Sequence, residues 1–93
     1  MYLFQRGETV VIDITIMDAE TEEPVNVNGV GVTLRDPNAS VIDTGAMTNT
    51  STGMYSYSYN LSSEALIGEY QARLNISTLI GYIVHDVYFY VEP

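Results

Sequence analysis

The chain has no cysteine, no lysine and no tryptophan. Without cysteine it has neither disulfides nor thiolate metal sites, so packing and hydrogen bonds must hold the fold together. Three arginines face twelve Asp and Glu residues, which gives a formal net charge of −9. Because this charge repels phosphate backbones and anionic lipid surfaces, we expect neither nucleic acid nor a membrane as a partner.

Long hydrophobic runs are also missing. No apolar stretch approaches the roughly 20 residues that a membrane-spanning helix requires. The opening residues 2–7 lack the basic start and apolar helix of a signal peptide, so no export signal is expected in them. With 93 residues the chain is predicted to form a single domain, 1–93, of about the size of a two-sheet sandwich.

The chain is rich in apolar residues that alternate with polar ones. In the segment 54–60, Tyr55, Tyr57 and Tyr59 share one side of an extended strand, and the segments 8–18 and 68–76 repeat the pattern. No segment of comparable length has helical spacing. The alternation therefore predicts an all-β protein.

Turn-forming residues divide the alternating segments. We expect strands over residues 2–5, 8–17, 30–35, 41–47, 54–61, 68–76 and 81–91, with 48–53 as a turn-prone link and 62–67 as a single helical turn. About seven strands without helical crossovers favour an antiparallel β-sandwich over a parallel sheet. A small barrel is the alternative.

Short motifs around the predicted turns carry a family resemblance. They are Gly7-Glu-Thr-Val10, Pro24-Val25, Val32-Thr-Leu-Arg-Asp-Pro37, Gly53-Met-Tyr55 and Gly68-Glu-Tyr70. Together they resemble immunoglobulin-like (Ig-like) β-sandwiches, and more narrowly domains built like the second macroglobulin domain and bacterial or phage Ig-like modules. The resemblance covers most of the chain and implies a scaffolding or adhesion role with no catalytic residue.

The residues themselves offer little to catalysis. The only histidine, His85, is a weak basis for a triad, because a nucleophile needs a base and that base needs an orienting partner. His85 and Asp86 are adjacent, so in a strand they point to opposite faces. We therefore expect no enzyme activity, no catalytic residue and no cofactor.

The segment 18–24 concentrates four carboxylates, at Asp18, Glu20, Glu22 and Glu23. Calcium prefers six to eight oxygen ligands from flexible loops, but the ordered spacing of a calcium-binding loop is missing here. A solvated acidic loop is the favoured interpretation, and we expect no metal site.

The closing strand is apolar on both sides. Ile83, Val87, Phe89 and Val91 are predicted to face the core, which leaves four large side chains on the opposite face. Either the first strand covers that face or another protein does, and tyrosine suits such contacts. The interface candidates are Tyr82, Val84, Tyr88 and Tyr90, together with Tyr2 and Phe4.

These features predict a non-enzymatic structural or interaction module whose partner is a protein or a second copy. The start at Met1 without an export signal favours a small virion component, such as a capsid decoration, head-fibre or neck protein, made in the host cytoplasm. The alternative is an extracellular adhesion domain of a surface protein. Carbohydrate is a possible ligand in that case, because segment 37–63 is nearly uncharged and rich in Tyr and Asn.

Overall fold

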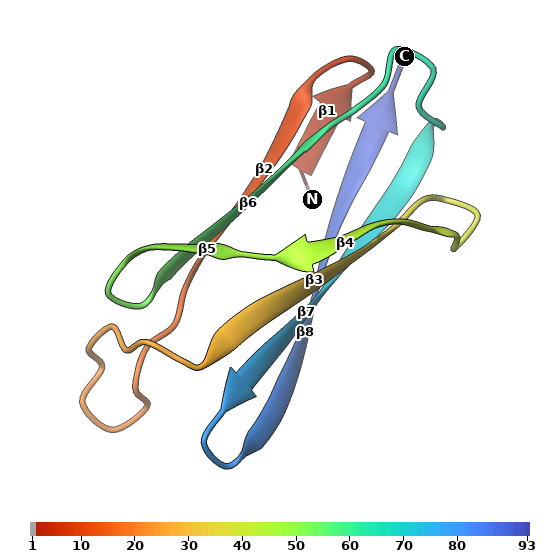
Figure 1. The fold of residues 1–93 in the computed structure, drawn as a ribbon. Coiled ribbons are helices and arrows are strands. Elements are labelled where there is room, and N and C mark those ends of the chain that lie inside the picture. Colours follow the sequence, from red (N-terminus) through yellow and green to blue (C-terminus); the bar gives the residue numbers. More distant parts are fainter. Residues whose placement is uncertain (1) are drawn as a thin grey trace.

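The computed structural model describes residues 2–93, which form eight strands and no helix (Figure 1). No segment of 2–93 is therefore a helix long and apolar enough to cross a membrane. The strands are β1 (Tyr2–Gln5), β2 (Thr9–Thr15), β3 (Gly29–Arg35), β4 (Val41–Ala46), β5 (Thr48–Ser51), β6 (Met54–Asn60), β7 (Gly68–Thr78) and β8 (Gly81–Glu92).

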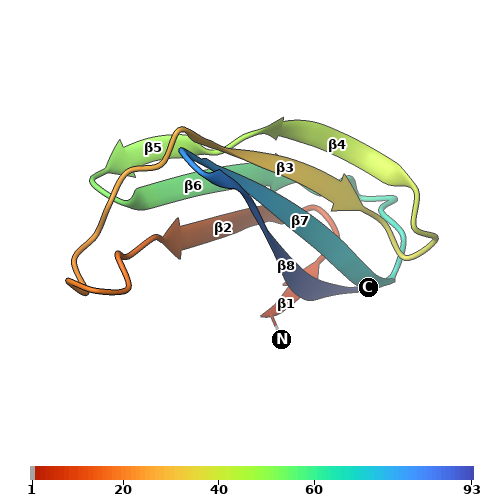
Figure 2. The ribbon, with the colours of Figure 1, turned by 90° about the horizontal axis from the view of Figure 1, so that it is seen from below.

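The strands form two stacked sheets (Figure 2). One sheet has five strands in the order β1-β8-β7-β3-β4, and the other has three in the order β2-β6-β5. All neighbouring strands are antiparallel except β1 and β8, which join the two ends of the chain in parallel. The predicted antiparallel β-sandwich is confirmed.

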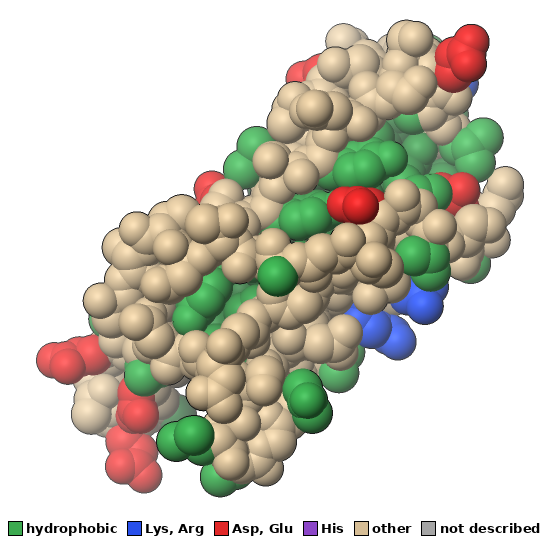
Figure 3. Space-filling view, in the orientation of Figure 1, with side chains coloured by type: hydrophobic (Ala, Val, Ile, Leu, Met, Phe, Trp, Pro, Cys, Tyr) green, Lys and Arg blue, Asp and Glu red, His purple; other side chains and the backbone are tan. Residues whose placement is uncertain are grey.

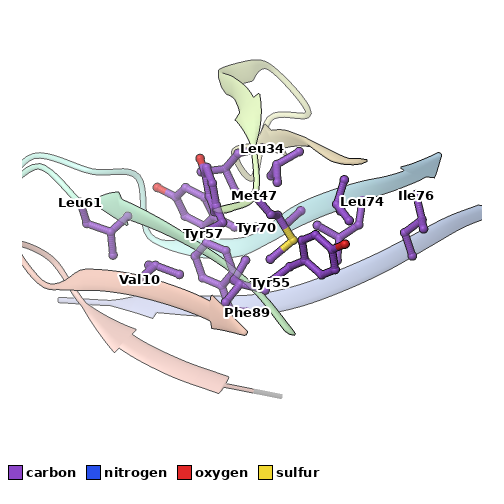
Figure 4. Close-up of a cluster of buried hydrophobic side chains, with 14 of the residues drawn as sticks. Val10, Leu34, Met47, Tyr55, Tyr57, Leu61, Tyr70, Leu74, Ile76 and Phe89 are labelled. Carbon is purple, nitrogen blue, oxygen red and sulfur yellow. The ribbon is translucent and has the colours of Figure 1, made fainter. Parts of the chain in front are cut away.

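The core lies between the sheets and follows the predicted alternation. Each strand directs every second side chain inward, because neighbouring residues point to opposite faces. The ring of Tyr70 stacks on that of Phe89 with centroids 5.1 Å apart (Figure 4). Such stacking adds to the free energy gained from apolar burial. The buried residues are Val10, Ile12, Val30, Val32, Leu34, Met47, Tyr55, Tyr57, Leu61, Tyr70, Ala72, Leu74, Ile76, Phe89 and Val91.

Along one side of the sandwich the chain passes directly from one sheet to the other. β4 belongs to the larger sheet and β5 to the smaller one, and buried Met47 connects them while its N–H donates to the Val30 carbonyl at 2.8 Å. Our prediction of one strand to residue 47 and a link over 48–53 was therefore wrong. Residues 48–51 form β5 because they pair with β6, although their polar side chains carry no apolar alternation.

Two further expectations were wrong in detail. Residues 62–67 form no helical turn; the Ala65 N–H donates to the Ser62 carbonyl at 3.1 Å and closes a tight turn over 62–65. β2 ends at Thr15 rather than at residue 17, because Ile16 leaves β6 and bonds instead to Gly53 and Val25.

Candidate interaction surface

The outer face of β8 carries an apolar strip made of Tyr82, Val84, Tyr88 and Tyr90, which we call the outer strip. All four side chains are exposed, Tyr82 at 78% and Val84 at 55%. Their partners across β7 are the polar residues Ser77, Asn75, Gln71 and Glu69. The outer strip is thus an apolar row beside the polar outer row of β7.

An ion pair interrupts the outer strip. Arg73 on β7 donates two hydrogen bonds to the Asp86 carboxylate, at 2.9 and 3.2 Å. The hydrogen bond from Arg73 lowers the pKa of Asp86 below its ordinary value. Because both side chains are in contact with water, the pair contributes little to stability and mainly fixes the two side chains.

The remaining candidates, Tyr2 and Phe4, lie on a different surface. Both side chains line a groove of about 720 Å³ that opens between β2 of the smaller sheet and β8 of the larger one. The ring of Phe4 packs edge-on against Phe89 with centroids 5.6 Å apart. The six predicted interface residues therefore divide between the outer strip and this groove.

The exposure of Ile83 corrects the prediction that it faces a closed core. Ile83 lies on the inward side of β8, as Val87 and Phe89 do, but it remains 56% exposed. The cause is that the three-stranded sheet is narrower than the five-stranded one and does not cover this end of β8. Val87 is half-buried along the groove, and only Phe89 and Val91 are fully inside.

The sequence reasoning missed the tip of the β7–β8 hairpin. Leu79 and Ile80 occupy the two-residue turn and are 94% and 98% exposed. Hydrophobic side chains are visible at this end of the molecule in Figure 3. The signal in the sequence was an apolar pair immediately before Gly81, where a turn normally carries polar residues.

The acidic loop is organised by its own backbone. One carboxylate oxygen of Asp18 accepts the N–H groups of Glu20 at 2.8 Å and Thr21 at 3.1 Å. These backbone hydrogen bonds lower the pKa of Asp18. Within residues 2–93 no group of three or more histidine or acidic side chains is placed to hold a metal ion.

The two Gly-x-Tyr motifs tie loops to the sheets. Gly53 has a φ of +74°, and a Cβ there would lie 2.7 Å from the Ile16 carbonyl oxygen. Two residues on, the buried Tyr55 hydroxyl accepts the Val27 N–H at 3.0 Å. In the second motif Gly68 approaches Pro37, and the Tyr70 hydroxyl donates to the Leu66 carbonyl at 2.7 Å. Both motifs therefore serve the fold.

These observations define the class of protein: an Ig-like β-sandwich domain that presents an apolar strip and a groove. The MG2 domain family matches residues 2–86, and the chain belongs to that family.

Solved structures of bacterial α2-macroglobulins have the same fold. The Salmonella protein reacted with methylamine superposes with a TM-score of 0.80 at 23% identity, over 98% of this chain and 6% of that one. The Escherichia coli protein activated by porcine elastase gives 0.77 at 21%, over 96% and 8%. The native E. coli protein gives 0.74 at 23%, over 98% and 5%. The chain thus spans less than a tenth of each of these proteins. A search among curated proteins found no match.

Proposed function

We propose that this chain is a non-catalytic interaction domain that packs through the outer strip against a neighbouring protein surface. The observation that supports the proposal is the concentration of Tyr82, Val84, Tyr88 and Tyr90 on one strand face. Tyrosine and valine at such exposure are costly to leave in water and favourable to bury at a contact. Tyrosine also loses little side-chain entropy when it is fixed at an interface.

The placement of the candidate groups supports the non-catalytic role that we propose. Asp86 is held by Arg73 on the outer face, whereas His85 lines the groove on the other side of β8. The two side chains therefore cannot act as an acid–base pair. Tyr55 and Tyr57 are buried in the core, so they are unavailable for stacking on a sugar.

The setting we propose is a larger macroglobulin-type protein located outside the cytoplasm. The family match and the small share of each α2-macroglobulin that the chain spans support this setting over a virion component. None of the matched proteins named above is a virion protein. The neighbouring surface is then a protein, and most economically another domain of the same polypeptide.

Tyrosine nitration mapped by mass spectrometry tests the proposal. In the isolated chain we expect tetranitromethane to modify Tyr82 and Tyr88 readily, because both are exposed. In the natural protein that contains the domain, both should be protected, while buried Tyr70 reacts in neither sample. Equal modification of Tyr82 and Tyr88 in the two samples would refute a contact through the outer strip.

A further inference from the structure

Along one stretch of β8, between Gly81 and Tyr88, the outer backbone edge is not covered by any described strand. β1 pairs with β8 only from Phe89 to Glu92, starting at Tyr2. The opposite edge of β8 is fully used, because β7 pairs with it from Gly81 to Val91. An open strand edge is a template for another strand, since its N–H and C=O groups lack partners.

Apolar side chains next to this edge form a surface against which an added strand would pack. Ile83 and Val87 point to the core side, where Ile83 is exposed and Val87 is half-buried. Val87 lines the groove, and Ile12 and Ile14 of β2 line its opposite wall. Within residues 2–93, β2 pairs only with β6, so it borders the groove with its own free edge. Figure 2 shows β2 and β8 along this open side of the sandwich.

The dimensions suit an extended segment. Eight residues of β8 at about 3.3 Å each offer roughly 26 Å of edge. The groove of about 720 Å³ lies within the range of well-formed binding sites, and its lining includes Tyr2 and Phe4 of β1 and residues 85–89 of β8. A strand in line with β1 would continue the larger sheet and place alternate side chains over Ile83 and Val87.

The charges indicate what kind of segment fits. The groove lining holds no arginine, and its acidic residues are Asp13 and Asp86, but the Asp86 side chain points to the outer face of β8. Asp86 is paired with Arg73, whereas Asp13 forms no ion pair within residues 2–93. A second copy of this chain is unsuitable, because it carries a charge of −9 and its matching edges present the same carboxylates.

We propose that the groove between β2 and β8 accepts an extended strand from a partner protein, which pairs in parallel with residues 81–88 of β8. This strand carries small apolar side chains at alternate positions and a lysine or arginine that reaches Asp13. Main-chain hydrogen bonds supply affinity and the groove selects side chains, as in other cases of strand addition. The inference concerns the inward side of β8 and goes beyond the contact proposed for the outer strip.

The test uses a capped synthetic peptide in which threonine alternates with valine and one lysine takes a valine position, so that the lysine points to the groove with the remaining valines. When it binds, hydrogen exchange of the amides between Gly81 and Tyr88 should slow. A peptide with glutamate in place of lysine should bind about tenfold more weakly. The variant Asp13→Lys should invert this preference, because Asp13 is exposed and its replacement leaves the core intact.

A neighbouring pair of variants separates the groove from the outer strip. Ile83 and Val84 are 56% and 55% exposed but point to opposite faces of β8. Ile83→Lys should weaken peptide binding about tenfold by placing a cation against the peptide lysine, whereas Val84→Lys should leave it unchanged. The contact proposed for the outer strip should respond in the opposite way. It should be impaired by Val84→Lys and not by Ile83→Lys, so the two proposals can fail independently.

Three results would overturn the proposal. The first is no binding of the lysine peptide at millimolar concentration. The second is equal loss of binding in Ile83→Lys and Val84→Lys. The third is sedimentation showing that the chain alone dimerises and protects the same amides, which would assign this edge to a second copy. A peptide methylated on alternate backbone nitrogens is the control for strand pairing and should not bind.

Discussion

At the scale of single residues, the Gly-x-Tyr motifs owe their character to glycine. Gly53 combines a positive φ with a backbone approach that leaves no room for a Cβ, because the Ile16 carbonyl and the Val25 nitrogen lie within 2.8 Å of the place it would occupy. Its N–H also donates to the Asn26 side chain at 2.7 Å. This one position therefore joins the β5–β6 turn to the loop that follows β2.

The first prediction compares two glycines of similar backbone shape. Gly53→Ala adds both left-handed strain and a steric clash, and should lower the free energy of unfolding by about 3 kcal/mol or more. Gly7→Ala has a φ of +84° but no atom within 4 Å of the new methyl group, so it should cost only about 1 kcal/mol. Urea denaturation of both variants measures the difference, and equal costs would show that the close approach does not matter.

The second prediction concerns Asp18 and pH. Its carboxylate accepts two backbone N–H groups in the folded state, so its pKa is lower there than in the unfolded chain. The stabilisation is therefore present above the unfolded pKa of about 4 and is lost as pH falls through the lower folded value. Asp18→Ala should be less stable than the parent chain at pH 7 and should approach it in strong acid. Urea midpoints measured across this range check the trend, which a constant difference would contradict.

At the scale of strands, alternation predicted which way the side chains point but not whether the other sheet covers them. In β7 the residues Tyr70, Ala72, Leu74 and Ile76 are all buried as expected. In β8 the same rule placed Ile83 on the correct side, but Ile83 is exposed, because no strand of the smaller sheet lies opposite it. Burial depends on sheet width, which is set by pairing between distant segments and leaves no periodic trace in one strand.

The third prediction uses a matched pair across β7 and β8. Ile76 and Ile83 are direct cross-strand partners on the same face, with exposures of 8% and 56%. Ile76→Ala should cost about 3 kcal/mol of stability, whereas Ile83→Ala should cost less than about 1 kcal/mol. Thermal or urea unfolding measures both. Similar costs would mean that the end of β8 is covered in solution, for example by self-association.

The fourth prediction concerns the hydrogen bond that joins the two sheets. The hydroxyl of Tyr57 on β6 donates to the carboxylate of Asp43 on β4. Burial, followed by this hydrogen bond and the charge of Asp43, raises the pKa of Tyr57. At neutral pH, Tyr57→Phe should cost about 1–2 kcal/mol, because half-buried Asp43 loses its donor. Tyr59→Phe is the control.

The same hydrogen bond has a consequence in alkali. The unfolded chain releases the tyrosine proton near pH 10, whereas folded Tyr57 retains it. Stability from this group is therefore complete below pH 10 and falls as pH rises above it. Tyr57→Phe should lose stability less steeply above pH 10 than the parent chain does. Parallel slopes in the two chains would show that Tyr57 ionises as freely in the folded state as in the unfolded one.

At the scale of the whole molecule, the sequence predicted the two-sheet architecture but not the pairing of its first strand with its last. β1 lies in parallel beside β8, and the polar segment 48–51 completes the smaller sheet. Neither pairing has a local signal, because both depend on strands that meet only once the sandwich has formed. The groove arises from the same arrangement, since short β1 covers only the last part of long β8.

The last prediction concerns charge. The molecule carries −9, and Arg73–Asp86 is the one ion pair within residues 2–93, so repulsion among carboxylates opposes the compact state. Sodium chloride shortens the Debye length from about 30 Å at 0.01 M to about 3 Å at 1 M. We therefore expect the unfolding temperature at pH 7 to rise with salt over this range.

The salt effect should depend on pH in a way that identifies its cause. Near pH 4 about half of the carboxylates are protonated and the chain is close to its isoelectric point of about 4.1, so the net repulsion fades and added sodium chloride should change the unfolding temperature little. Arg73→Gln provides a second check, because it raises the net negative charge and should steepen the salt dependence at pH 7. A fall in unfolding temperature with salt at pH 7 would mean that the exposed ion pair outweighs the general repulsion, contrary to the small contribution expected of such a pair.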